Sequence, residues 1–275
     1  MKKVYKKRIV ITGSSGLLGS YFIKKYKKKF QIINYPYKIQ EIKLFKKWII
    51  NKKFDYFIHF AAITRNSKEN KRKLFLINER SVKNILLTLN NYKKNYLKYF
   101  IFISSSHVYG NYTRKIMEKD KRKPNNDYGL SKKKIEDFIL KERKKFYFKV
   151  GIARIFNFTG PKQRKGYFVP DIIQKIKKLK MITNINKYRD FIHIDDLMDS
   201  LILLINKKFE PPLNICSGIK INLITICKMI NSKNAQREIL YEKKRGGDMF
   251  GNNSLLRKLG KKNFKNIKSI INSYK

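Results

Sequence analysis

Tyr128 and Lys132 stand four residues apart in the stretch YGLSK, beside a segment with helical spacing. Four residues make about one turn of an α-helix, so both side chains lie on one helix face. A phenol with a pKa of about 10 is a weak acid near neutral pH, and an adjacent ammonium group lowers that pKa. The pair could therefore exchange a proton with a substrate oxygen, although a chain rich in Tyr and Lys can also match this spacing by chance.

A glycine turn near the start of the chain is a second candidate functional site. The stretch TGSSGLLG runs from Thr12 to Gly19, between an apolar run and a helical pattern. Without side chains, backbone N–H groups there could approach a pyrophosphate at the positive end of the helix. The same spacing also occurs in strand–helix turns that bind no ligand. The expected cofactor contacts in this turn are Gly13, Ser14, Ser15, Gly16, Leu17, Leu18 and Gly19.

Alternating apolar runs and helical patterns must position these residues. Continuous apolar runs predict buried parallel strands at residues 8–12, 31–34, 56–60, 99–104 and 150–155. Helical patterns follow at 17–28, 39–50, 74–89 and 131–145, and later at 170–179, 194–205 and 223–230. Ala61 and Ala62, just after the third strand, would leave room for a cofactor at the sheet edge.

This alternation predicts an α/β fold with a Rossmann-type, doubly wound parallel sheet. We expect residues 1–155 to form a dinucleotide-binding domain. Residues 156–275 should form a smaller substrate-binding lobe, partly interleaved with the first domain.

Six motifs, in this order, resemble the extended short-chain dehydrogenases/reductases, the NAD-dependent epimerase/dehydratase family that acts on nucleotide sugars. Besides TGSSGLLG and YGLSK, these motifs are SSSHVYG (104–110), RIFNFTGP (154–161), RDFIHIDDL (189–197) and NICSG (214–218). The resemblance covers nearly the whole chain and implies an NAD(P)-dependent oxidoreductase.

The resemblance also implies roles for individual residues. Ser105, Tyr128 and Lys132 would be catalytic, with Lys132 also reaching the nicotinamide ribose. The further implied cofactor contacts are Ala61, Ala62, Asn78, Ser104 and Phe156. The implied substrate contacts are Ser105, Ser106, His107, Asn157 and Arg189. His107 could instead be a packed loop residue, which is the more frequent state of a lone His.

The end of the second predicted strand departs from the family pattern. NAD-preferring relatives usually place an acidic residue there, on the ribose hydroxyls. This chain has Asn34, Tyr35 and, further on, Lys38. A site without negative charge tolerates a 2′-phosphate, so we expect NADP(H), with NAD(H) as the alternative.

Only one predicted helix, at residues 39–50, lies between the second and third strands. This short connection and the RIFNFTGP stretch resemble those of reductases that act on 4-keto-6-deoxy nucleotide sugars. A 4,6-dehydratase should carry an Asp–Glu pair after the catalytic hydroxyl, where this chain has Ser106 and His107. A 4-epimerase of the same family is the main alternative. A non-catalytic dinucleotide- or RNA-binding protein is a more distant one.

The net charge of +47 arises from 66 Lys and Arg against 19 Asp and Glu. The lysines are spread along the chain, which favours a coding bias over a dedicated nucleic-acid partner. Two cysteines without metal spacing indicate a reducing, cytoplasmic setting and no metal site. No apolar run is long enough to span a bilayer. We expect a nucleotide-diphosphate sugar as the binding partner, and a homodimer remains open.

Overall fold

The computed structural model describes the chain except for residues 1–5, 65–69, 93–95, 162, 164–165, 179–181, 184, 232–245, 273 and 275. The chain divides into two compact units. The first contains residues 1–108, 124–154 and 204–212, and the second contains residues 109–123, 155–203 and 213–275. The exchange of segments reflects a chain that leaves and re-enters each unit.

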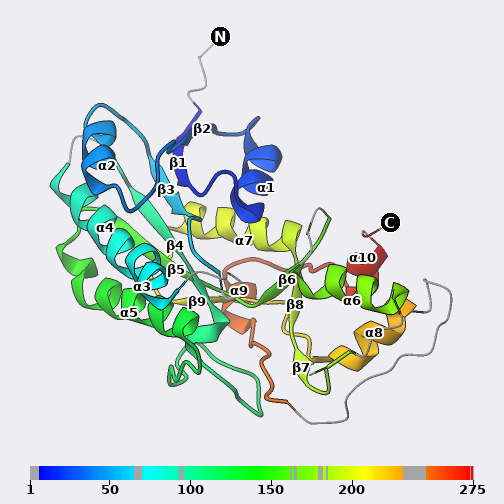
Figure 1. Cartoon of the computed structure of the whole chain (residues 1–275). Helices are drawn as coiled ribbons and strands as arrows, with labels where there is room; N and C mark the ends of the chain where they lie inside the picture. The colour runs from blue at the N-terminus through cyan, green and yellow to red at the C-terminus, as the bar shows by residue number, and fades with distance from the viewer. Residues whose placement is uncertain are drawn as a thin grey trace. The chain divides into compact units, whose positions relative to one another are not determined.

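A six-stranded parallel sheet forms the centre of the fold (Figure 1). Its order is β2-β1-β3-β4-β5-β9. The strands are β1 (Arg8–Thr12), β2 (Gln31–Asn34), β3 (Tyr56–His59), β4 (Tyr99–Ser105), β5 (Lys149–Ile155) and β9 (Leu213–Ile215). The structure thus confirms the α/β class and the parallel sheet that the continuous apolar runs predict.

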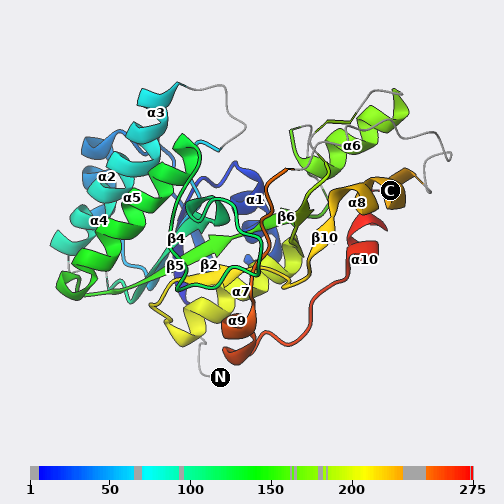
Figure 2. The same ribbon diagram turned by 90° about the horizontal axis from the view of Figure 1, so that it is seen from below.

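Helices cover both faces of this sheet in the first unit. On one face, α2 (Ile42–Ile49), α4 (Val82–Asn91) and α5 (Asp127–Glu142) lie together (Figure 2). Their apolar residues pack with those of β1, β3, β4 and β5 in one buried cluster. On the opposite face lies α1 (Leu17–Tyr26), whose Phe22 ring contacts Phe60 at 5.7 Å between centroids. Burial of these apolar surfaces is the main force that holds the layers together.

The helix before α4 contains an irregular turn. It begins as α3 (Lys71–Phe75), continues as a π-helix over Leu76–Ser81, and then becomes α4. π-Helices are rare in proteins, and those that occur are often found at functional sites. Here the π-helix carries Asn78, one of the expected site residues.

Helix α5 begins earlier than the sequence pattern predicts. The expected helix starts at Ser131, whereas the observed one starts at Asp127. Asn126 explains the difference, because its side chain accepts a hydrogen bond from the N–H of Gly129 at 2.8 Å. This N-cap satisfies a backbone donor that would otherwise lack a helical partner. Tyr128 and Lys132 are thereby placed within the same regular helix.

The second unit combines helices with short strands. Its strands are β6 (Asn157–Thr159), β7 (Tyr188–Arg189), β8 (Phe191–His193) and β10 (Ile221–Asn222), besides β9. Its helices are α6 (Phe168–Lys177), α7 (Ile194–Lys207), α8 (Leu223–Asn231), α9 (Ser254–Lys258) and α10 (Ile267–Asn272). The sequence does not predict the short strands, α9 or α10. Strands of two or three residues are too short to show an alternating pattern, and helices of five or six residues are too short to show an apolar face.

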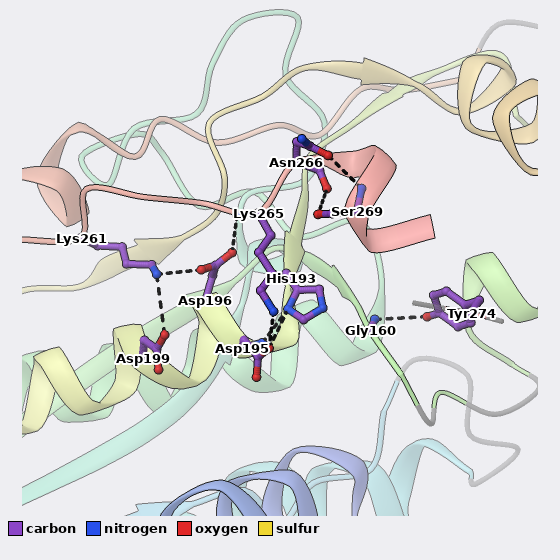
Figure 3. A network of polar contacts seen from close by, with 10 residues as sticks. All are labelled: Gly160, His193, Asp195, Asp196, Asp199, Lys261, Lys265, Asn266, Ser269 and Tyr274. Atoms are coloured by element: carbon purple, nitrogen blue, oxygen red, sulfur yellow. Dashed lines mark hydrogen bonds and ion pairs between the residues drawn. The ribbon is translucent and has the colours of Figure 1, made fainter. Parts of the chain in front are cut away.

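Ion pairs attach the chain after α9 to the first turn of α7 (Figure 3). Asp196 accepts hydrogen bonds from Lys261 Nζ at 2.7 Å and from the N–H of Lys265 at 2.8 Å. The Nζ of Lys265 in turn lies 2.6 Å from Asp195. The two carboxylates lie in the first turn of α7, where negative charge is favourable. Their bonds to Lys261 and Lys265 attach the C-terminal segment to α7 within the same unit.

Among the described helices, none is long and apolar enough to cross a membrane.

Candidate active site

The candidate site of the first unit lies where parallel strands end. Thr12 at the end of β1 pairs in register with His59 at the end of β3, and His59 pairs with Phe102 of β4. In open α/β sheets, ligands bind outside the carboxyl ends of the strands. The glycine turn, Ala61 and Ser105 all follow or end these strands. The topology therefore gathers the expected cofactor and catalytic residues of this unit at one sheet edge.

The glycine turn packs closely against the backbone at the ends of the strands. Gly13 has φ +70°, and a Cβ on it would lie 2.6 Å from the backbone nitrogen of Ala61. A Cβ on Gly19 would lie 2.2 Å from the carbonyl oxygen of Gly13. Gly16 directly precedes α1 and donates a hydrogen bond to the same carbonyl at 3.1 Å. The backbone leaves no room for a Cβ at Gly13 or Gly19, and the turn lies at a helix N-terminus, so the residues of this glycine cradle fit a dinucleotide cofactor.

The side chain of Asn78 holds the loop after β3 through hydrogen bonds made by both of its polar atoms. Its Oδ1 accepts from the N–H of Ile63 at 2.8 Å, and its Nδ2 donates to the carbonyl of Ile63 at 2.8 Å. Nδ2 also lies 3.3 Å from the Oγ of Ser131 on α5. Asn78 therefore joins the loop that follows Ala61 and Ala62 to the helix of Tyr128.

Tyr128 and Lys132 share one face of α5, as their spacing predicts. The Lys132 ammonium lies 5.9 Å from the centre of the Tyr128 ring. The imidazole of His107 meets the same ring edge-on at 5.7 Å between centroids. Lys132 is 2% exposed, whereas Tyr128 is half-buried. Tyr128 is therefore partly accessible to solvent, whereas the ammonium group beside its ring is buried.

Burial controls the charge of Lys132. It lowers the pKa of the ammonium to about 7, and the nearby Glu136 carboxylate opposes this change. The Nζ donates a hydrogen bond to the carbonyl oxygen of Ile103 at 2.9 Å and faces the Phe102 ring at 5.0 Å. Lys132 therefore changes its charge in the pH range where enzymes commonly transfer protons.

The three serines at and just after the end of β4 have different environments. The Oγ of Ser104 donates a hydrogen bond to Glu136 at 2.5 Å, so this hydroxyl faces the protein interior. The Oγ of Ser105 accepts a hydrogen bond from the N–H of His107 at 3.3 Å. Ser106 is buried and opens a short 3₁₀ turn, Ser106–Val108. Ser105 is thus bonded to the backbone of His107, whose ring contacts that of Tyr128.

Sequence reasoning missed two buried supports of the site. Glu136 and Arg154 form a bidentate ion pair, with Arg154 Nη2 2.7 Å from Glu136 Oε2. His59 contacts Thr12, with its Nδ1 2.9 Å from the hydroxyl oxygen. Two signals could have revealed the ion pair: Glu136 lies one helical turn after Lys132, and Arg154 interrupts an apolar strand.

Three expected site residues belong to the second unit. Asn157 begins β6, and its Nδ2 lies 3.4 Å from the carbonyl oxygen of Asp190. Arg189 Nη1 donates hydrogen bonds to the carbonyls of Tyr188 and Gly247, both at 2.7 Å. Phe156 is buried, with its ring 6.4 Å from that of Tyr109. The structure thus brings Asn157 and Arg189 into one neighbourhood of this unit.

Asp190, which directly follows Arg189, is a buried carboxylate that orders the NICSG loop. It accepts hydrogen bonds from the N–H and Oγ of Ser217 and from the N–H of Gly218, each at 2.8 Å. Burial nevertheless raises the pKa of Asp190 to about 6. These bonds couple the RDFIHIDDL and NICSG motifs, which lie far apart in the sequence.

The parallel sheet, the glycine cradle at its edge and the Tyr–Lys helix define a Rossmann-type enzyme of the short-chain dehydrogenase/reductase kind. The chain belongs to the NAD dependent epimerase/dehydratase family, whose model matches residues 9–216. The family resemblance noted in the sequence and the expectation of an enzyme are both confirmed.

Comparison with individual proteins gives several activities within this family. The chain is 27% identical over 240 residues to the GDP-6-deoxy-D-talose 4-dehydrogenase of Aggregatibacter actinomycetemcomitans, covering 81% of this chain and 79% of the relative. It is 26% identical to the dTDP-D-glucose 4,6-dehydratase of Dictyostelium discoideum, covering 81% and 61%. It is 26% identical to the dTDP-4-dehydro-6-deoxyglucose reductase of Escherichia coli, covering 86% and 84%.

A solved structure has the same fold. RMD from Pseudomonas aeruginosa complexed with NADPH superposes with a TM-score of 0.84 at 23% identity, covering 97% of this chain and 98% of that chain. At this identity the likeness establishes the fold. The chain is therefore a nucleotide-sugar enzyme of the dehydratase, reductase and epimerase family.

Proposed function

We propose that the protein reduces the 4-keto group of a nucleotide-linked 6-deoxysugar. The observation that carries this proposal is the group formed by Tyr128, Lys132 and Ser105 in the first unit. Its serine is followed by Ser106 and His107 rather than by carboxylates. The group has a proton donor and a hydrogen-bond donor for a ketone oxygen, without the acid–base pair that eliminating water from the sugar requires.

In this proposal Tyr128 acts as the general acid. Bound NAD(P)H would supply a hydride to the carbonyl carbon of the sugar. As charge develops on the ketone oxygen, the Tyr128 phenol gives its proton to that oxygen. The Lys132 ammonium favours the resulting phenolate by its positive charge. The Ser105 hydroxyl donates a hydrogen bond to the same oxygen and so fixes the ketone for proton transfer.

The glycine cradle would hold the cofactor, and its preference would be for NADP(H). The end of β2 offers the exposed Asn34, and Lys38 is exposed a few residues later. An acidic side chain on the ribose would repel a 2′-phosphate, whereas these two residues would not. Binding of NAD(H) is the alternative.

Asn157 and Arg189 would contact the diphosphate of the substrate. Backbone carbonyls hold Arg189 Nη1, which fixes the plane of the guanidinium. A fixed guanidinium can present a fork of donors that matches phosphate oxygens. Asn157 would add an amide donor beside it.

The test offers GDP- and dTDP-linked 4-keto-6-deoxysugars to the purified protein with NADPH or NADH. Loss of reduced-cofactor absorbance, equal in amount to the 4-hydroxy nucleotide sugar formed, supports the proposal. Interconversion of 4-hydroxyl epimers without net cofactor use would establish the epimerase alternative. Formation of a 4-keto-6-deoxysugar from an unmodified nucleotide hexose would establish a dehydratase and overturn the proposal.

A further inference from the structure

A buried ionic cluster lies one turn of α5 beyond Lys132, the candidate catalytic lysine. It contains Glu136 of α5, Arg154 of β5 and Ser104 of β4, none of which is more than 2% exposed. The mechanism proposed above does not use Glu136 or Arg154. Removing two opposite charges from water costs several kcal/mol per ion, so their presence beside Lys132 requires an explanation.

Arg154 and Ser104 occupy both oxygens of the Glu136 carboxylate. Arg154 Nε lies 3.0 Å from Oε1 and 3.1 Å from Oε2, and Nη2 lies 2.7 Å from Oε2. The Oγ of Ser104 donates to Oε1 at 2.5 Å. This is a bidentate arrangement, the geometry in which Arg and carboxylate bind most strongly.

Lys132 lies one turn before Glu136 on the same helix, where such pairs commonly form ion pairs. Its Nζ instead donates to the carbonyl oxygen of Ile103 and remains near the Tyr128 ring. The hydrogen bonds from Arg154 explain this choice, because a carboxylate already bound to a guanidinium attracts a second cation only weakly.

Charged and titratable groups act on Lys132 from several elements. Glu136 and Tyr128 share its helix, and Arg154 on β5 neutralises Glu136. His59 on β3 is fully buried, and the positive charge of Lys132 helps to lower its pKa to about 3, so the imidazole stays neutral. Near neutral pH, the opposite charges of Glu136 and Arg154 thus act on Lys132, and removing one of them would change the charge of Lys132.

We propose that Arg154 is a positioning residue that prevents Glu136 from capturing the Lys132 ammonium, and so keeps Lys132 directed at the Ile103 carbonyl and Tyr128. The functional meaning of this inference rests on the proposed reaction. The electrostatic relationship itself can be measured without substrate or cofactor.

The test measures the titration of Lys132 through its effect on folding. In each background, the free energy of unfolding is compared with that of the same protein carrying Lys132→Met, from pH 6 to pH 11 by urea denaturation. A lowered pKa means that the unfolded chain binds more protons than the folded one. The difference between the two proteins therefore changes with pH between the folded and the unfolded pKa of this lysine.

Two single variants should move the pKa of Lys132 in opposite directions. Arg154→Met frees the carboxylate to pair with the ammonium, and the pKa should rise by about 1–3 pH units, the usual effect of a close opposite charge. Glu136→Gln leaves the Arg154 cation uncompensated, and the pKa should fall. A purely structural role predicts lower stability in both variants without opposite shifts, so shifts of the same sign or none would overturn the proposal.

The double variant Glu136→Gln/Arg154→Met guards against single variants that do not fold. It removes both charges together, which is far less costly than leaving one of them unpaired. The pKa of Lys132 should then stay within about one pH unit of its wild-type value. A larger shift, or failure of this neutral variant to fold, would contradict the proposal.

Lys133→Met is the matched control. Lys133 is the next residue on α5, and it pairs with Asp137 at the surface, 3.0 Å away. Replacing it should give the same pH dependence in all four backgrounds. If the protein shows no reductase activity, the proposed function fails, while these titrations still decide the role of Arg154.

Discussion

The Nδ1 atom of His59 lies 2.9 Å from the hydroxyl oxygen of Thr12, and this contact joins the ends of β3 and β1. The same hydroxyl accepts a hydrogen bond from the N–H of Ala61 at 3.4 Å. His59 is fully buried, and within the described part of the chain its Nε2 has no hydrogen-bond partner. A neutral imidazole thus holds together the sheet edge that carries the glycine cradle.

This environment predicts a loss of stability in acid. Burial is the main cause that lowers the pKa of His59 to about 3, from 6.5. The unfolded chain therefore binds more protons than the folded one between these values. The stabilisation from neutral His59 is present above about pH 6.5 and declines as the pH falls towards 3, by at most about 1.4 kcal/mol per pH unit.

Urea denaturation of the wild type and of His59→Asn at pH 7, 6, 5 and 4 checks this prediction. The wild type should lose free energy of unfolding relative to the variant at each step. Asp190, whose raised pKa acts in the opposite sense below pH 6, is present in both proteins and cancels in the comparison. Parallel pH profiles would show that His59 does not titrate as its burial implies.

The glycines of the cradle should differ in what they contribute. A Cβ at residue 19 would lie 2.2 Å from the Gly13 carbonyl oxygen, whereas one at residue 16 would lie 3.3 Å from it. Gly19→Ala should therefore lower the stability by about 1–3 kcal/mol, as overpacking does. Gly16→Val should largely preserve the fold but place a side chain where the pyrophosphate would pass.

Urea denaturation and titration of NADPH fluorescence separate these two effects. Gly16→Val should bind NADPH much more weakly than the wild type with a similar unfolding midpoint. Unchanged NADPH affinity in this variant would mean that the turn does not hold the cofactor.

Tyr128→Phe tests the proton donor. The substitution removes only the phenolic oxygen, and loss of a positioned general acid typically lowers the rate by ~10²–10⁴-fold. Turnover of a 4-keto-6-deoxy nucleotide sugar should fall by that order, while the dissociation constant for NADPH changes little. Tyr96→Phe is the control, because Tyr96 is 60% exposed. Comparable turnover of Tyr128→Phe and wild type would exclude Tyr128 as the acid.

Asn34→Asp tests the cofactor preference. A carboxylate at the end of β2 would repel a 2′-phosphate and accept hydrogen bonds from ribose hydroxyls. The ratio of the dissociation constants for NADPH and NADH should rise by about tenfold or more, equivalent to 1.4 kcal/mol. Gln31→Glu makes the same change of charge at the other end of this strand, and should leave the ratio nearly constant. Tighter binding of NADH by the wild type would contradict the preference itself.

The central sheet could be predicted from sequence because its signals are local. The apolar runs of β1 and β2 predict the observed bounds of both strands, although β1 is largely buried and β2 is a more exposed strand at the edge of the sheet. The spacing of Tyr128 and Lys132 likewise predicts their common face, because four residues complete a helical turn. The periodicity predicts a start of α5 that is four residues too late, because the hydrogen bond from Gly129 to the Asn126 side chain leaves no trace in the apolar pattern.

By itself, the sequence determined the family, the parallel α/β sheet and the identity of the candidate cofactor and catalytic residues, because these depend on motifs and on spacing along the chain. Only the tertiary structure decided which buried polar groups surround them. Thr12 and His59 are 47 residues apart, and Ser104 and Glu136 are 32 apart, so no local pattern links them. Burial then sets the charge of Lys132 and His59, since the free energy of an ion depends on the water and the partners around it.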